Sequence, residues 1–232
     1  MDTITIERRY CGPSTSGNGG YTCGRVAAAI TGDAEVTLRK PPPLDKPMRL
    51  QRDADGVRLM DDDTVVADAR PVELELDVPP APSLDAARDA ERNYRGHREH
   101  AFPDCFVCGP GRADGDGLRI FTGPLAGTDR VASTWTPDDG LGDADGFVRP
   151  EFIWASIDCA GSWAPEPRPA GPIVLGRFAA GLRGRLRCGD TAIVIGWPIA
   201  VDGRKYRVGS AVFSAGGELI ACARATWIEL KA

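Results

Sequence analysis

The feature that most constrains the fold is a pattern that occurs twice along this chain of 232 residues. In each half, a strand-like stretch leads into a turn and a helix, and a run of strand-like segments follows. The helices are expected at 21–31 and 149–164, and the strands at 34–40, 47–53, 56–62 and 64–78, then at 173–187, 191–201, 205–215 and 218–230. We interpret the pattern as an internal duplication. The alternative is a single large antiparallel sheet with two helices.

The second helix, predicted over 149–164, carries an acid among apolar residues. Pro150 suits the first helical position, Glu151 suits the positive end of the helix dipole, and Gly161 begins the stop. Most of the circumference is apolar, which predicts burial. Asp158 is the exception, because a carboxylate in such a helix either reaches solvent or is held inside for chemistry.

A change of composition between residues 78 and 100 predicts the boundary between the halves. The segment VPPAPS is typical of a stiff linker, and Ser83 can cap an exposed helix over 84–97. We therefore predict an N-terminal unit over 1–80, a linker helix over 81–100 and a C-terminal unit over 101–232. A glycine-rich turn before a strand at 118–121 and another strand at 130–137 would open the C-terminal unit.

Composition and charge exclude several classes of function. The net charge is −5 and the basic residues are scattered, which argues against sequence-independent nucleic-acid binding. No apolar run approaches the roughly 20 residues of a membrane span, and the first residues lack the apolar region of an export signal. The seven cysteines show no disulfide framework. We expect a cytoplasmic protein that binds neither nucleic acid nor membrane.

Two short motifs resemble those of a known family. The run CFVCGP at 105–110, followed by GLRI at 117–120, resembles the opening of many thioesterases of the PaaI-like group. Asn18, Gly19 and Gly20 are similar to that group's HGG motif, whose acid lies nine positions after the first residue. The same count from Arg149 reaches Asp158, whereas from Asn18 it reaches Ala27. The resemblance covers nearly the whole chain.

This resemblance implies an α+β fold, a tandem (double) hotdog in which each long antiparallel sheet wraps around a central helix. It also implies an acyl-CoA or acyl-carrier thioesterase that needs no cofactor. Asp158 would activate water or attack the thioester, and Asn18, Gly19 and Gly20 would supply amides that bind the carbonyl oxygen. The alternative is a hotdog protein that binds an acyl ligand without catalysis, in which Asp158 is structural.

Other side chains have both a functional and a structural interpretation. Tyr21, Glu151, Trp154 and Trp163 are candidate substrate-binding residues, although a first-turn glutamate usually serves the dipole and tryptophans usually belong to the core. Asn18 could be a simple N-cap. Surface arginines could meet the nucleotide end of coenzyme A, although strand arginines more often form a solvated face. The candidates are Arg177, Arg183, Arg185, Arg187 and Arg204. Pairing through sheet edges would give a homodimer.

A zinc site is a separate alternative, because zinc-ligand types occur together within twelve residues, at His97, His100, Cys105 and Cys108. The family turn accounts for the cysteines without a metal, so the sequence favours no metal. A thioredoxin-like redox motif lacks its surrounding pattern. Motifs for a nucleophile elbow, a P-loop and a dinucleotide-binding loop are also missing. Both histidines lie in the linker region, which disfavours a hydratase and a Ser-His-Asp triad.

Overall fold

One continuous antiparallel sheet organises the protein. The computed structural model describes residues 2–231, and its eleven strands lie in the order β1-β3-β4-β5-β2-β8-β11-β10-β9-β7-β6. The strands are β1 (Thr3–Ile4), β2 (Ala34–Leu38), β3 (Met48–Arg52), β4 (Val57–Asp61), β5 (Thr64–Pro71), β6 (Gly123–Pro124), β7 (Val131–Trp135), β8 (Ile173–Leu182), β9 (Ala192–Asp202), β10 (Lys205–Ser214) and β11 (Leu219–Glu229). The predicted strands of both halves therefore share one sheet.

The longer helices follow the predicted positions. They are α1 (Gly19–Ala27), α2 (Leu84–Glu91), α3 (Pro150–Ser156) and α4 (Cys159–Ser162), with short 3-10 helices at Arg8–Tyr10, Arg95–His97 and Asp139–Leu141. Ser83 caps α2 by accepting a hydrogen bond from Ala86 N, as predicted. None of the helices in residues 2–231 is long and apolar enough to cross a membrane.

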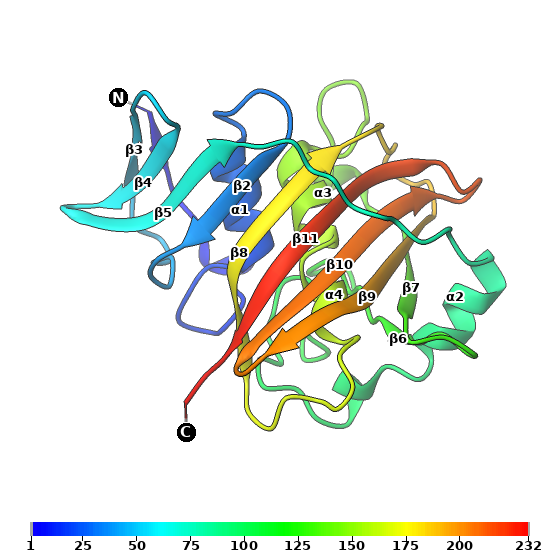
Figure 1. The fold of residues 1–232 in the computed structure, drawn as a ribbon. Coiled ribbons are helices and arrows are strands. Elements are labelled where there is room, and N and C mark those ends of the chain that lie inside the picture. Colours follow the sequence, from blue (N-terminus) through cyan, green and yellow to red (C-terminus); the bar gives the residue numbers. More distant parts are fainter. Residues whose placement is uncertain (1, 232) are drawn as a thin grey trace.

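The two halves of the sheet meet at the pairing of β2 with β8. Val36 lies opposite Phe178 in this antiparallel ladder, and both side chains are buried. Figure 1 shows α1, α3 and α4 on the same face of the curved sheet, with α1 behind the N-terminal strands and α3 and α4 behind the C-terminal strands. The ladder therefore brings the helices of the two halves together.

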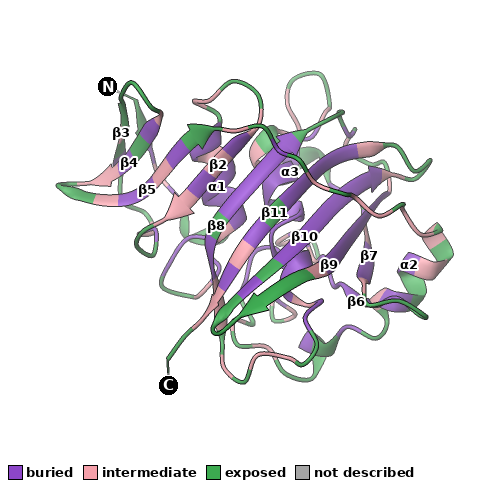
Figure 2. Ribbon diagram, in the orientation of Figure 1, coloured by how far each residue is buried: buried purple, intermediate pink, exposed green. Residues whose placement is uncertain are grey.

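Each face of the sheet is covered by apolar residues. The main core lies between the sheet and the helices and includes Phe106, Phe152 and Phe178. On the opposite face, the connector that follows β5 crosses the C-terminal strands and contributes Leu74 and Leu76 to a second cluster. Figure 2 shows that the middles of β8 to β11 are buried, whereas the β9–β10 end is exposed. Both layers hold the central strands in place.

Several predicted boundaries are corrected by the structure. The helix predicted over 149–164 is broken, because α3 ends at Ser156 and α4 begins at Cys159. The Ile157 carbonyl accepts a hydrogen bond from Ser210 Oγ, which offers it a partner outside the helix. Residues 118–121 form no strand, and their backbone instead bonds to the 102–110 loop, where Leu118 N donates to Phe106 O.

Candidate active site between the helices of the two halves

Asn18 joins the start of α1 to Asp158, which lies 140 positions away along the chain. As the N-cap of α1, its Oδ1 accepts from Tyr21 N at 2.9 Å. This contact orients the amide, so that Nδ2 donates to Asp158 Oδ2 at 3.1 Å. The predicted cap is therefore present, and the same side chain also contacts the predicted acid.

Gly20 supplies the second contact to this carboxylate. Its backbone N–H donates to Asp158 Oδ2 at 2.9 Å. A Cβ atom at Gly20 would lie 2.4 Å from Asp158 Cβ, and one at Gly24 would lie 2.8 Å from Glu151 Cα. The glycine face of α1 thus packs against α3 and the break after it. Only glycine allows this approach.

Asp158 lies at the break between α3 and α4 and not in the middle of a helix. Asp158 is 1% exposed, and no group in residues 2–231 donates a hydrogen bond to its Oδ1. Burial raises the pKa of Asp158 from its ordinary value of 3.8 to about 7, although the hydrogen bonds from Gly20 and Asn18 act in the opposite direction. The carboxyl group is therefore poised to exchange a proton near neutral pH.

The catalytic residues predicted from the sequence lie close together, rather than on opposite sides of an open cleft. Asp158 touches the Asn18 and Gly20 donors directly, without a cavity between them. Gly19 is the first residue of α1, a position where the helix itself offers the amide no acceptor. A Cβ atom at Gly19 would lie 2.8 Å from Leu175 Cδ2, so a larger residue would collide with that side chain. The site thus combines a buried acid with the amides at a helix N-terminus.

The predicted substrate-binding residues lie in two separate places in the structure. Tyr21 is buried and stacks on Tyr10 with ring centroids 4.2 Å apart. Trp154 is also buried and meets Phe178 edge to face. Glu151 forms an ion pair with Arg149 at 3.3 Å. The burial of Trp154 matches the core interpretation of the tryptophans, and a role of these residues in substrate binding stays a prediction.

Trp163 lies apart from this group, near the linker region. Its ring packs edge to face on Tyr94, and Arg168 lies over it. Trp163 also lines a hollow of about 150 Å³ together with Arg95 and Glu166. A second hollow of about 500 Å³ is lined by Arg8, Arg9, Cys11, Ser14, Asp104, Gly111, Arg112, Ala113 and Asp116. Asp158 lines neither of these two hollows.

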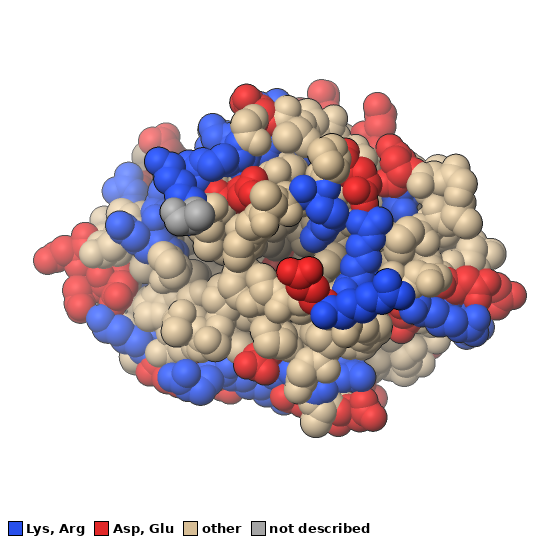
Figure 3. Space-filling model, turned by 90° about the horizontal axis from the view of Figure 1, so that it is seen from below, with Lys and Arg blue, Asp and Glu red and all other residues tan. Residues whose placement is uncertain are grey.

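The arginines that were candidates for nucleotide contacts mostly have partners within the chain, and of the five only Arg177 lies in a strand. Arg183 pairs with Asp33 at 2.7 Å and Arg185 pairs with Asp143 at 2.6 Å. Arg204 donates to the Glu229 carbonyl at 2.7 Å. Figure 3 shows basic and acidic side chains interspersed over one face. These contacts favour the solvated-face interpretation, and the nucleotide contact stays a prediction.

Sequence reasoning missed the sulfur atoms beside the acid. Cys159 Sγ lies 3.9 Å from Asp158 Oδ2, and Cys105 Sγ lies 3.8 Å from Asn18 Nδ2. Thiol hydrogen bonds from Cys108 and Cys159 hold the pKa of Cys105 below its ordinary value. The resulting negative charge helps to raise the pKa of Asp158. Only the position of Cys159 next to the predicted acid could have signalled this from the sequence.

Comparisons with known proteins identify the fold. A candidate thioesterase from Novosphingobium aromaticivorans is similar with a TM-score of 0.63 and 11% identity, covering 99% of this chain and 95% of the other. A TesB protein from Mycobacterium avium subspecies paratuberculosis gives 0.58 and 13%, covering 93% and 88%. A hot dog fold protein of unknown function from Alicyclobacillus acidocaldarius gives 0.55 and 13%, covering 99% and 93%.

These similarities place the chain among hotdog-fold structures over almost its whole length, which confirms a hotdog fold, whereas the tandem arrangement stays a prediction. Neither the family models nor the curated proteins compared with the sequence match it. At these identities the comparisons establish the fold, and the chemistry has to be argued from the site.

Proposed function

We propose that the protein is an acyl thioesterase that hydrolyses acyl-CoA esters. The observation that carries this proposal is the contact of the buried Asp158 carboxylate with the Asn18 amide and the Gly20 N–H, which come from the other half of the chain. Thioester hydrolysis needs a base or nucleophile near the carbonyl carbon and donors for the oxygen on which charge develops. Similarity in fold to thioesterase-type structures is consistent with this chemistry.

The roles follow from the two oxygen atoms of Asp158. Oδ1 has no donor within the described chain and is the atom that would take a proton from water. The hydroxide so formed adds to the thioester carbon, and the carbonyl oxygen becomes an oxyanion. The C–S bond then breaks, and the leaving thiolate recovers the proton from Asp158. Direct attack by Asp158, through an anhydride, is the second form of this mechanism.

Gly20 N–H would stabilise the oxyanion, aided by the positive end of α1. In the structure this N–H donates to Asp158 Oδ2. The substrate oxygen would therefore replace Oδ2 as acceptor, and the released carboxylate would turn toward the carbonyl carbon. This exchange keeps the Gly20 N–H paired before and during the reaction.

We also propose that residues 1–80 and 101–232 are two hotdog units with one site between them. The count that leads from Arg149 to Asp158 leads from Asn18 to Ala27, which has no ionisable group. At the equivalent helix start of the second half stands Pro150, which has no N–H to donate. The symmetry-related pocket would lack the acid and one of the N–H groups at the helix start, leaving one site per chain.

Hydrolysis of a panel of acyl-CoA esters, followed with a thiol reagent, tests the proposal. We expect turnover by the wild type, at least a hundredfold less by Asp158→Asn, and full activity for Asp63→Asn, an exposed matched control in the β4–β5 hairpin. Saturable binding without released thiol would instead assign a ligand-binding role. Unchanged activity of Asp158→Asn on every hydrolysed ester would refute Asp158 as base or nucleophile.

Homodimer formation through a sheet edge is the accompanying proposal about assembly. The edge strands β1 and β6 contain two residues each, so a partner would need to extend the pairing beyond them. Light scattering on the purified protein should give twice the mass of the 24.7 kDa chain. A monomeric mass at micromolar concentration would contradict it.

A further inference from the structure

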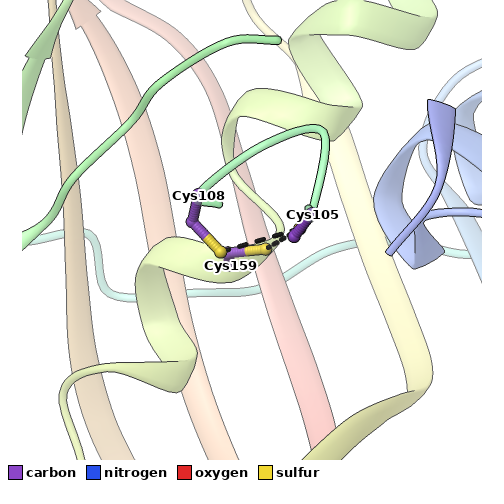
Figure 4. A group of neighbouring side chains, drawn as sticks. All are labelled: Cys105, Cys108 and Cys159. Atoms are coloured by element: carbon purple, nitrogen blue, oxygen red, sulfur yellow. Dashed lines mark hydrogen bonds between the residues drawn. The ribbon is translucent and has the colours of Figure 1, made fainter. Parts of the chain in front are cut away.

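Three buried thiols from two distant segments meet beside the candidate active site. Cys105 and Cys108 lie on the 102–110 loop, and Cys159 is the first residue of α4. Cys105 Sγ lies 3.7 Å from Cys108 Sγ and 3.8 Å from Cys159 Sγ, and all three sulfur atoms lie within 4.8 Å of one another. Figure 4 shows the three side chains converging on one point between the loop and α4.

We propose that Cys105, Cys108 and Cys159 bind a zinc ion, with His100 as the fourth ligand. Zinc in structural sites is held tetrahedrally, and a Zn–S bond of about 2.3 Å places neighbouring sulfurs about 3.8 Å apart. The two measured separations match this spacing.

The loop around Cys105 is a tight turn, in which Cys105 N donates to Phe102 O at 2.9 Å. The turn closes with Gly109 N donating to Cys105 O at 2.9 Å. A Cβ at Gly109 would lie 2.3 Å from the Pro103 carbonyl oxygen, so only glycine fits. The turn therefore fixes the Cys105 thiol at the point where it meets Cys108 and Cys159.

His100 is the side chain best placed to complete the site. Its Nε2 lies 3.3 Å from Cys108 Sγ, and its Nδ1 accepts from Phe102 N at 2.9 Å. Binding the ion through Nε2 requires the imidazole to carry its proton on Nδ1 and to exchange the Phe102 contact for another acceptor. The ring must also turn toward the other two sulfurs. This adjustment involves one side chain on a loop.

The structure therefore changes the ligand set that the sequence spacing suggested. His97 is exposed, and its ring packs against Phe121 with centroids 4.8 Å apart. It is replaced by Cys159, which is distant in sequence but adjacent to Asp158. With Cys159 as a ligand, the ion would tie the 102–110 loop to the break between α3 and α4. A structural role, with a closed coordination shell, follows from this placement.

Metal analysis of protein purified without a polyhistidine tag, from cells grown with zinc, tests the proposal. We expect about one zinc per chain in the wild type and at least a tenfold loss in Cys159→Ser and His100→Gln. The matched controls are Cys222→Ser, a buried cysteine on β11, and His97→Gln, and both should keep full zinc content. Circular dichroism establishes that each variant is folded.

A second measurement does not depend on the folding of any variant. Titrating the wild-type thiols with a mercurial should release zinc to a chromophoric chelator. Cobalt added to the metal-free, reduced wild type should give intense thiolate-to-metal absorption with a tetrahedral ligand field. The proposal is overturned if the wild type holds no zinc and gives no such absorption. It is equally overturned if Cys159→Ser keeps full zinc content, and full zinc in His100→Gln refutes the fourth ligand.

Discussion

Replacing Asp158 by asparagine should change how stability depends on pH, independently of any assay of activity. The folded-state pKa of Asp158 is about 7, whereas its ordinary value is 3.8. Between these two values the folded protein holds a proton at Asp158 that the unfolded chain has lost. The free energy of unfolding therefore falls as pH rises through this window and levels off above about pH 7.

The size of the effect follows from the interval between the two pKa values. At about 1.4 kcal/mol for each pH unit, the ionised carboxyl costs the folded state about 4 kcal/mol above neutral pH. At pH 5 most of this cost is not yet present, because the folded protein keeps Asp158 protonated. Between pH 5 and pH 8 the wild type should lose about 2.5 kcal/mol through this group alone. The Asp158→Asn variant has no proton to lose at this position and escapes the cost.

Urea unfolding of both proteins at several pH values between 5 and 8 measures the difference. The stability of Asp158→Asn relative to wild type should rise by about 2.5 kcal/mol across the range, while Asp63→Asn should follow the wild type. A relative stability that does not vary with pH would mean that Asp158 titrates at its ordinary value. The argument from burial would then be wrong, and a slope of opposite sign would indicate a charge partner instead.

The remaining predictions concern the donors and the rate. The kcat/KM of an active acyl-CoA ester should rise with pH to a plateau, with an apparent pKa of about 7, because the reactive form of Asp158 is ionised; a flat profile between pH 5 and 9 would exclude a base of this kind. Gly20→Ala should destabilise the fold by about 1–3 kcal/mol, since its Cβ would lie 2.4 Å from Asp158 Cβ, and activity should fall more than tenfold. The matched variant Gly216→Ala, in an open turn, should do neither when both are compared by thermal unfolding and assay. Asn18→Ser keeps a cap oxygen for Tyr21 N but loses the donor to Asp158. The midpoint of the pH–rate curve should therefore move to higher pH. An unchanged midpoint would show that the Asn18 contact does not influence the pKa of Asp158.

Local rules predicted much of the fold. Ser83 and Asn18 cap the helices that they were expected to cap, because a short polar side chain before a helix has one favourable role. The alternating segments after each helix form strands, although the strands expected over 64–78 and 173–187 end earlier, at Pro71 and Leu182. The break in the helix over 149–164 was not predictable, because it depends on Ser210 from a distant strand, which bonds the Ile157 carbonyl.

The candidate site was predicted in part for a similar reason. The nine-residue spacing taken from the family motif selected Asp158 and Asn18, and these two residues are in contact. The motif reflects how two helices pack against each other, which local sequence patterns do not predict. Their direct contact depends on how closely Gly20 and Gly24 allow α1 to approach α3. The sulfur cluster escaped prediction because the local spacing of His97 and Cys108 pointed to neighbours in sequence, whereas Cys159 arrives from the other side of the fold.

Two adjacent residues at the helix break belong to different sites: Asp158 to the candidate active site and Cys159 to the proposed zinc site. Asp158 turns toward α1, where it meets the Gly20 N–H, and Cys159 turns toward the 102–110 loop, where it meets Cys105. The same loop reaches the start of the chain, because Phe106 N donates to the Cys11 carbonyl at 2.8 Å. A zinc ion bound by Cys159 and by the 102–110 loop would therefore hold two segments in place. These are the helix break that carries Asp158 and the N-terminal segment that leads into α1. The break in the helix allows these two different directions. In a continuous helix, consecutive side chains are fixed about 100° apart around the axis, whereas the backbone at the break is free of that constraint.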